Sequence, residues 1–144
     1  MRGSVPTAHA HFGLGNALLD TTVLIDILRG RPETTRRLLA LQTVGDIPYA
    51  CAIGVDEVAR GLRPSEVTAA RRLFAGLRIA GVGEAEGWQS GTWRQTFAAS
   101  GVTLSRSDCF VAAAALRLGA RLCTGNPNDF PMSEIVVEHW PVGP

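Results

Sequence analysis

Residues 17–28 constrain the fold of this chain more than any other part of its sequence. Apolar residues run up to an acid, Asp20, and return at helical spacing after two threonines. We therefore expect a short buried strand to end at Asp20, followed within two residues by a helix that Thr21 or Thr22 caps. In open parallel sheets, ligands bind beyond the carboxyl ends of the strands. Asp20 is thus expected at the edge where proteins of this class carry out their chemistry.

The rest of the chain repeats this alternation of short apolar runs and helical patterns. Further strands are expected at 47–53, 76–82, 121–124 and 135–137, and further helices at 32–44, 54–62, 66–74, 84–100 and 108–118. Such alternation predicts a three-layer α/β/α sandwich around a parallel sheet of four to five strands. The 144 residues contain no repeat or linker, which suits one domain. We expect this domain at 17–144, and residues 1–16 as an N-terminal extension, natural or left by cloning.

Side-chain positions follow from the same periodicities. Asp26 falls on the far side of the first helix from its apolar residues and is expected in solvent. Trp88 and Phe97 are expected to pack inward from the helix at 84–100. Asp56 is expected to be an exposed neighbour of Glu57.

The composition excludes several functions. No apolar run approaches the ~18 residues that a membrane span needs, so no membrane partner is expected. All 14 basic residues are arginine, so no mechanism can use a lysine, and phosphate binding falls to guanidinium groups. This disfavours aspartyl-phosphate enzymes of the haloacid-dehalogenase or receiver type, which rely on a lysine. The 3 cysteines lack the CxxC spacing of a zinc site, which indicates buried thiols in a reducing cytoplasm.

Three further acids stand where a predicted strand has ended or a helix begins: Glu57, Asp108 and Asp129. Strand ends and the following helix starts share one edge of a parallel sheet, so these acids can converge on Asp20. Carboxylates packed together repel one another unless a cation lies between them. Mg²⁺ or Mn²⁺ prefers carboxylate and water oxygens, and metal-assisted phosphodiester hydrolysis is the natural chemistry of such a site. Each acid alone also has a structural explanation, as a helix-dipole partner or a turn residue.

Four phrases of the sequence resemble the motifs of PIN-domain ribonucleases, in the same order along the chain. They are LLDTTVLID at 18–26, AIGVDEVARG at 52–61, SDCFVAAAA at 107–115 and LCTGNPNDF at 122–130. Thr22 stands where the family usually has serine or asparagine. Length and motif order are similar to those of VapC-type toxins. The resemblance implies a PIN-like fold and a cytoplasmic, Mg²⁺- or Mn²⁺-dependent endoribonuclease, the toxin of a type II toxin–antitoxin pair. It also implies a homodimer and a small cognate antitoxin as partner.

The resemblance further implies that Asp20, Glu57, Asp108 and either Asp129 or Asn126 hold the metal ion and catalyse RNA cleavage. Asn126 occupies a position that is often aspartate in relatives, so both candidates for the fourth ligand stay open. Thr22 and Thr124 are expected to orient carboxylates by hydrogen bonds. Arginines near this edge are expected to bind RNA phosphates: Arg29, Arg31, Arg60, Arg63 and Arg106. Because Asn126 lowers the negative charge, a PIN-like module that binds RNA or protein without cleavage is the alternative.

Overall fold

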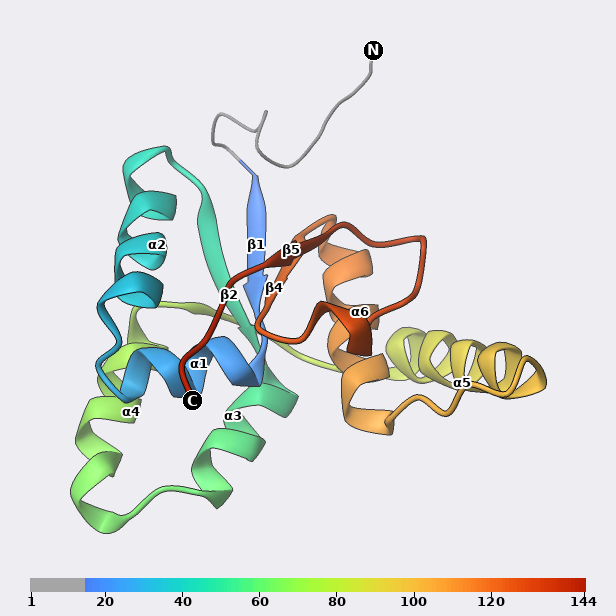
Figure 1. Cartoon of the computed structure of the whole chain (residues 1–144), viewed down its shortest axis with the longest axis horizontal. Helices are drawn as coiled ribbons and strands as arrows, with labels where there is room; N and C mark the ends of the chain where they lie inside the picture. The colour runs from blue at the N-terminus through green and yellow to red at the C-terminus, as the bar shows by residue number, and fades with distance from the viewer. Residues whose placement is uncertain (1–14) are drawn as a thin grey trace.

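A five-stranded parallel sheet forms the centre of residues 15–144, the part of the chain that the computed structural model describes (Figure 1). Its strands are β1 (Asn16–Leu19), β2 (Ile47–Cys51), β3 (Arg78–Ala80), β4 (Arg121–Thr124) and β5 (Val137–His139). The order across the sheet is β3-β2-β1-β4-β5, with parallel neighbours throughout. The chain leaves β1 first toward β2 and later returns to β4 on its other side. The carboxyl ends of β1 and β4 therefore form the switch point where sheets of this type bind ligands.

Helices cover both faces of the sheet, which confirms the predicted three-layer sandwich. One face carries α1 (Thr21–Leu28), α2 (Pro32–Thr43), α3 (Ala52–Arg60) and α4 (Val67–Ala75), and the other carries α5 (Glu84–Ala99) and α6 (Arg106–Leu118). Two short 3₁₀ helices are η2 (Pro64–Glu66) and η3 (Pro127–Asp129). Successive residues of β1 point to opposite faces: Ala17 and Leu19 join the core under α1–α4, and Leu18 joins the core under α5 and α6.

Two of the helices that carry candidate site residues, α1 and α6, begin at side-chain caps. α1 starts at Asp20 itself, whose carboxylate accepts a hydrogen bond from the Val23 backbone N–H at 3.3 Å. The prediction of Thr21 or Thr22 as this cap was therefore wrong. α6 starts at Ser105, whose hydroxyl accepts a bond from the Asp108 backbone N–H at 3.1 Å. α6 ends at Gly119, which takes the left-handed conformation (φ 61°) that glycine adopts without strain.

Two boundary differences matter for the site. α3 begins at Ala52, two residues before the predicted start, so Glu57 lies in the second turn and does not serve the helix N-terminus. The strand after η3 is Val137–His139 and pairs with β4, whereas the apolar run predicted 135–137. Most of the predicted extension lies outside the described residues, and Asn16 is the first residue of β1.

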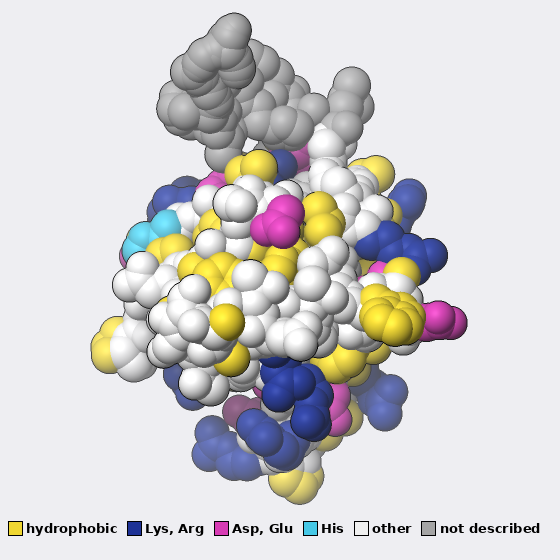
Figure 2. All heavy atoms as spheres, turned by 90° about the vertical axis from the view of Figure 1, so that its right-hand side faces the viewer, with side chains coloured by type: hydrophobic (Ala, Val, Ile, Leu, Met, Phe, Trp, Pro, Cys, Tyr) yellow, Lys and Arg dark blue, Asp and Glu magenta, His cyan; other side chains and the backbone are white. Residues whose placement is uncertain are grey.

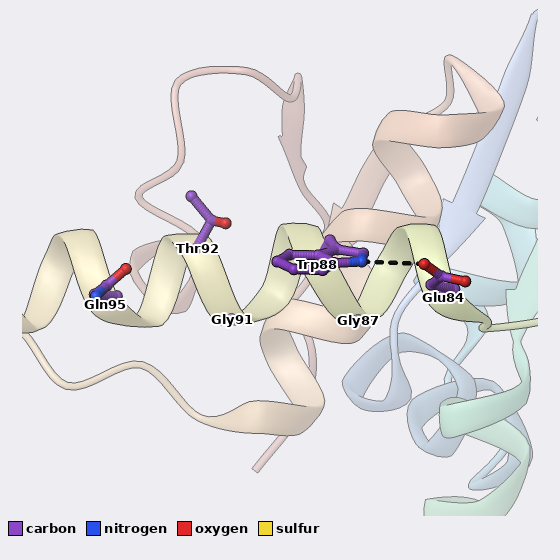
Figure 3. A pocket seen from close by; sticks show the side chains of 6 residues that line it. All are labelled: Glu84, Gly87, Trp88, Gly91, Thr92 and Gln95. Atoms are coloured by element: carbon purple, nitrogen blue, oxygen red, sulfur yellow. Dashed lines mark hydrogen bonds between the residues drawn. The ribbon is translucent and has the colours of Figure 1, made fainter.

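Trp88 is exposed, contrary to the prediction. The residue is 72% exposed, its indole N–H donates to Glu84 at 3.2 Å, and it borders a shallow hollow of about 460 Å³ (Figure 3). Trp93 is the buried tryptophan of α5, because five helical positions turn a side chain by roughly 140°. Phe97 packs against the core as predicted.

The 3 cysteines Cys51, Cys109 and Cys123 are buried and unpaired, as their apolar surroundings predict. Among the helices of residues 15–144, none has the length and apolar character to cross a bilayer.

Candidate active site

Four of the predicted acids line one pocket of about 240 Å³ at the carboxyl ends of the central strands. They come from four separate segments: Asp20 follows β1, Glu57 lies on α3, Asp108 on α6 and Asp129 at the end of η3. The remaining lining residues are Thr21, Thr22, Ile25, Arg60, Val111 and Phe130. The fold thus gathers acids that the sequence separates by as many as 109 positions, from Asp20 to Asp129.

Asp20 is the most firmly held of the four acids. It is 7% exposed, and its backbone N–H donates to the carbonyl of Cys123 on β4 at 3.0 Å. One carboxylate oxygen accepts a bond from the Thr22 hydroxyl at 2.5 Å, and the other accepts one from the Thr124 hydroxyl at 2.5 Å. Burial raises the pKa of Asp20, and these hydrogen bonds oppose the rise.

Thr22 and Thr124 also bind the loop that follows β4. Thr22 accepts a bond from the Gly125 backbone N–H, and Thr124 accepts one from the Asn126 backbone N–H, both at 2.9 Å. Each threonine therefore joins the end of β1 to the end of β4. Both hydroxyls thus donate to the Asp20 carboxylate, and their role in orienting it for a metal ion stays a prediction.

Glu57 has a partner that the sequence analysis did not assign to the site. The Thr21 hydroxyl donates to its carboxylate at 2.5 Å, across 36 positions of sequence. Thr21 belongs to the pocket lining, but the sequence pattern marked it only as a possible helix cap. Its place directly after Asp20, with a hydroxyl at the same sheet edge, was the available signal.

The pKa of Asp108 reflects the burial and the negative charge of the pocket. Burial raises the pKa of its carboxyl group against a hydrogen bond with Ser105, and the negative charges of Asp129, Asp20 and Glu57 raise it further. The three other acids are thus close enough for their charges to disfavour ionisation of Asp108. A divalent cation in this pocket would relieve that repulsion.

The two candidates for the fourth ligand differ in position. Asp129 is exposed but lines the pocket, whereas Asn126 is exposed and is not among the lining residues. Asn126 instead precedes η3, and its carbonyl accepts a bond from the Asp129 backbone N–H at 3.0 Å. The pocket geometry favours Asp129.

The predicted RNA-binding arginines do not all reach the pocket. Arg60 lines it, while Arg29 and Arg106 are exposed outside the lining. The Arg31 guanidinium is occupied, because it donates to Asp26 at 2.9 Å and to the carbonyl of Pro141 at 3.2 Å.

Exposed arginines occur along the segment from α3 to α4, and one of them, Arg60, lines the pocket. Figure 2 shows basic side chains gathered at the lower end of the visible face, at the level at which Figure 1 draws α3 and α4. The exposed arginines in the segment from α3 to α4 are Arg60, Arg63, Arg71 and Arg72.

The acids line the pocket walls without forming a closed coordination shell. Within residues 15–144, no three His, Cys, Asp or Glu side chains lie close enough together to hold a metal ion as they stand. Asp20 and Glu57 are instead bound by threonine hydroxyls. The donor set still fits a hard cation, because four carboxylates from four segments face one pocket. Burial, and then the charges of the other three carboxylates, raise the pKa of Asp108. Mg²⁺ or Mn²⁺, which keeps several waters, needs only part of such a set.

Comparison with known proteins gives consistent results. The PIN domain family matches residues 17–131. Ribonuclease VapC19 of Mycobacterium tuberculosis is 30% identical over 115 residues, which cover 80% of this chain and 92% of that protein. The DNA-bound VapBC structure from Salmonella typhimurium superposes with a TM-score of 0.77 at 22% identity, covering 88% of this chain and 99% of that one. A toxin–antitoxin complex from Klebsiella pneumoniae gives 0.69 at 24% identity, covering 86% and 99%. These structural likenesses show the same fold.

Proposed function

Because this chain belongs to the PIN-domain family, we propose that it is an endoribonuclease that hydrolyses RNA phosphodiester bonds with bound Mg²⁺ or Mn²⁺. The observation that carries the proposal is the convergence of Asp20, Glu57, Asp108 and Asp129 on one pocket. The similarity to a protein named as a ribonuclease supports the choice of RNA as substrate.

In the proposed reaction, each polar residue of the pocket has its own role. When bound, the divalent ion activates a water molecule and neutralises charge on the scissile phosphate. Asp20 and Asp108 would hold the ion, since a strand end and a capped helix start fix their backbones. Glu57 would hold the ion or orient the attacking water, and Asp129 would complete the acidic wall. Arg60, the one arginine in the described lining, would bind a phosphate beside the cut.

We further propose that the protein is the cytoplasmic toxin of a type II toxin–antitoxin pair. The similarity to a VapC ribonuclease and to a toxin–antitoxin complex supports this assignment. The cognate antitoxin would be a small protein that places a cationic segment over the acidic pocket, where opposite charges favour binding. The toxin itself would be a homodimer.

Replacement of Asp20 by asparagine tests the enzyme assignment. Wild-type protein should cleave RNA with Mg²⁺ or Mn²⁺ and stop when EDTA removes the metal. Asp20→Asn should lower the cleavage rate about 100-fold or more, because it removes a charged group that holds the ion. Asp56→Asn is the matched control, since Asp56 is an exposed acid directly before Glu57 and should leave the rate unchanged.

A different outcome would favour the second candidate. Tight RNA binding by the wild-type protein without cleavage in either metal would indicate a PIN-like binding module. The absence of a closed carboxylate cluster within the described residues is the observation that keeps this alternative testable.

A further inference from the structure

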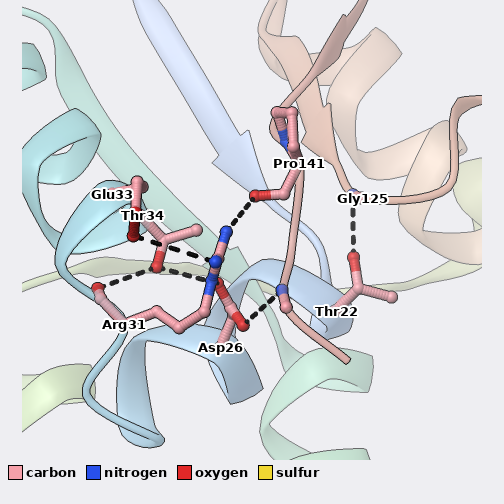
Figure 4. A network of polar contacts seen from close by, with 8 residues as sticks. Thr22, Asp26, Arg31, Glu33, Thr34, Gly125 and Pro141 are labelled. Atoms are coloured by element: carbon pink, nitrogen blue, oxygen red, sulfur yellow. Dashed lines mark hydrogen bonds and ion pairs between the residues drawn. The ribbon is translucent and has the colours of Figure 1, made fainter.

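A short segment far from the acids in sequence lies against the loop that holds Asp20. Residues 140–143, here called the strap, follow β5. The Trp140 backbone N–H donates to the carbonyl of Thr124 at 2.8 Å, and the carbonyl of Pro141 accepts from Arg31 at 3.2 Å. The strap is therefore bound both to the end of β4 and to the loop between α1 and α2. Figure 4 shows the second of these contacts, between Arg31 and Pro141.

Asp26 anchors the far end of the strap. The residue is 4% exposed, so the prediction of a solvent residue was wrong. The carboxylate accepts bonds from the Gly143 backbone N–H at 3.0 Å, the Arg31 guanidinium at 2.9 Å and the Thr34 hydroxyl at 3.0 Å (Figure 4). Burial would raise the pKa of Asp26, but these bonds outweigh it and lower the pKa, so Asp26 is a charged anchor at neutral pH.

Val142 is the residue of the strap that packs on the loop after β4. A methyl group added to Gly125 would lie 2.7 and 2.8 Å from the two terminal carbons of Val142, closer than real contacts allow. The valine side chain is therefore packed directly on the Gly125 backbone. The same methyl group would lie 3.2 Å from the Thr22 hydroxyl oxygen, so Gly125 is enclosed between Val142 and Thr22.

Gly125 in turn belongs to the hydrogen bonds that fix Asp20. Its N–H donates to Thr22, which donates to one oxygen of Asp20, and the neighbouring Thr124 donates to the other oxygen. A continuous path of contacts thus runs from Asp26 through the strap and Gly125 to the Asp20 carboxylate.

We propose that the strap is a positioning element of the acidic pocket, which presses Gly125 onto Thr22 and so keeps both oxygens of Asp20 in their orientation. Its consequence for metal binding rests on the function proposed above. Groups that orient a metal ligand commonly change metal affinity by 10–100-fold when they are removed. The strap contacts Gly125 and not the Asp20 carboxylate itself. We therefore expect the strap to change metal affinity by a smaller factor, about 3–10-fold.

The substitution Val142→Ala tests the positioning without any metal. Amide hydrogen exchange of the metal-free protein should be about tenfold faster at Gly125 and Asn126, the two N–H groups that donate to the threonines. The Asp20 amide, which donates to Cys123 within the sheet, should keep its protection. Val136→Ala is the matched control, because that valine is 56% exposed and loses the same atoms. Val142→Thr keeps the branched shape and should restore the protection.

The binding of Mn²⁺, measured by calorimetry, tests the consequence. Val142→Ala and Asp26→Asn should bind Mn²⁺ about 3–10-fold more weakly than wild type, while Val136→Ala and Val142→Thr should bind it equally well. Unchanged exchange at Gly125 and Asn126 in Val142→Ala would overturn the inference, and so would faster exchange with unchanged Mn²⁺ affinity. A wild-type protein that binds no Mn²⁺ would contradict the proposed function, and the exchange pattern alone would then decide the role of the strap.

Discussion

The pKa of a single residue, Asp108, depends on the charges of the other acids in the pocket. Burial and the carboxylates of Asp129, Asp20 and Glu57 hold the pKa of its carboxyl group above the ordinary value. An acid whose folded-state pKa is raised costs stability at pH values above that pKa. The cost fades as the pH falls through the folded-state pKa and the group takes up its proton. The metal-free pocket is therefore a source of instability at neutral pH.

Asp108→Asn should consequently stabilise the metal-free protein. At pH 7 with EDTA we expect a gain on the order of 1 kcal/mol or less, seen as a rise of a few degrees in the midpoint of thermal unfolding. The gain should shrink as the pH is lowered toward the raised pKa. With excess Mn²⁺ the order should reverse, because the ion stabilises the wild type that binds it. A mutant less stable than wild type in EDTA would contradict this account of the repulsion.

Individual residues differ in how far the sequence predicts them. Asp20 was predictable because an acid directly after a buried apolar run has little other reason to be there. Asp26 was not, because its partners include Gly143, 117 positions away, and a helical pattern contains no such contact. Thr21 was missed for the same reason, since Glu57 lies on another helix.

At the scale of elements, α6 depends on one hydroxyl for its start. Ser105 and Ser107 both lie at the start of this helix, and the Ser105 hydroxyl is the one that accepts the Asp108 backbone N–H. Ser105→Ala should lower the free energy of unfolding by about 1 kcal/mol, since it leaves the Asp108 N–H without its acceptor. Ser107→Ala is the control and should change it by less than about 0.5 kcal/mol. Urea denaturation of both variants measures the difference, and equal effects would refute the assignment.

Elements with strong local signals were predicted well. β1, α1, α5 and α6 follow apolar runs, helical spacing and terminal glycine or serine residues. β5 was placed two residues early, because three-residue edge strands take their register from the neighbouring strand and not from their own pattern. The exposure of Trp88 had no local signal either, since a helix pattern does not say which apolar side chains lack a neighbour.

At the scale of the whole molecule, two cores flank the sheet and enclose all three cysteines. Burial raises the pKa values of the Cys51, Cys109 and Cys123 thiols, which keeps them protonated and unreactive. The native protein should therefore react slowly with a thiol reagent such as Ellman's reagent, and the denatured protein should release three equivalents. Rapid reaction of any cysteine under native conditions would show that the packing around it opens.

The central position of β1 has a consequence for the order of events during synthesis. The Asp20 carboxylate accepts a hydrogen bond from the hydroxyl of Thr124, 104 positions later in the chain. β1 likewise gains its second neighbouring strand only when β4 has been synthesised. The ribosome must therefore add every residue up to β4 before the two halves of the sheet can meet. The acidic pocket is therefore completed only at that late stage of synthesis, when Asp108, Thr124 and Asp129 have joined Asp20 and Glu57.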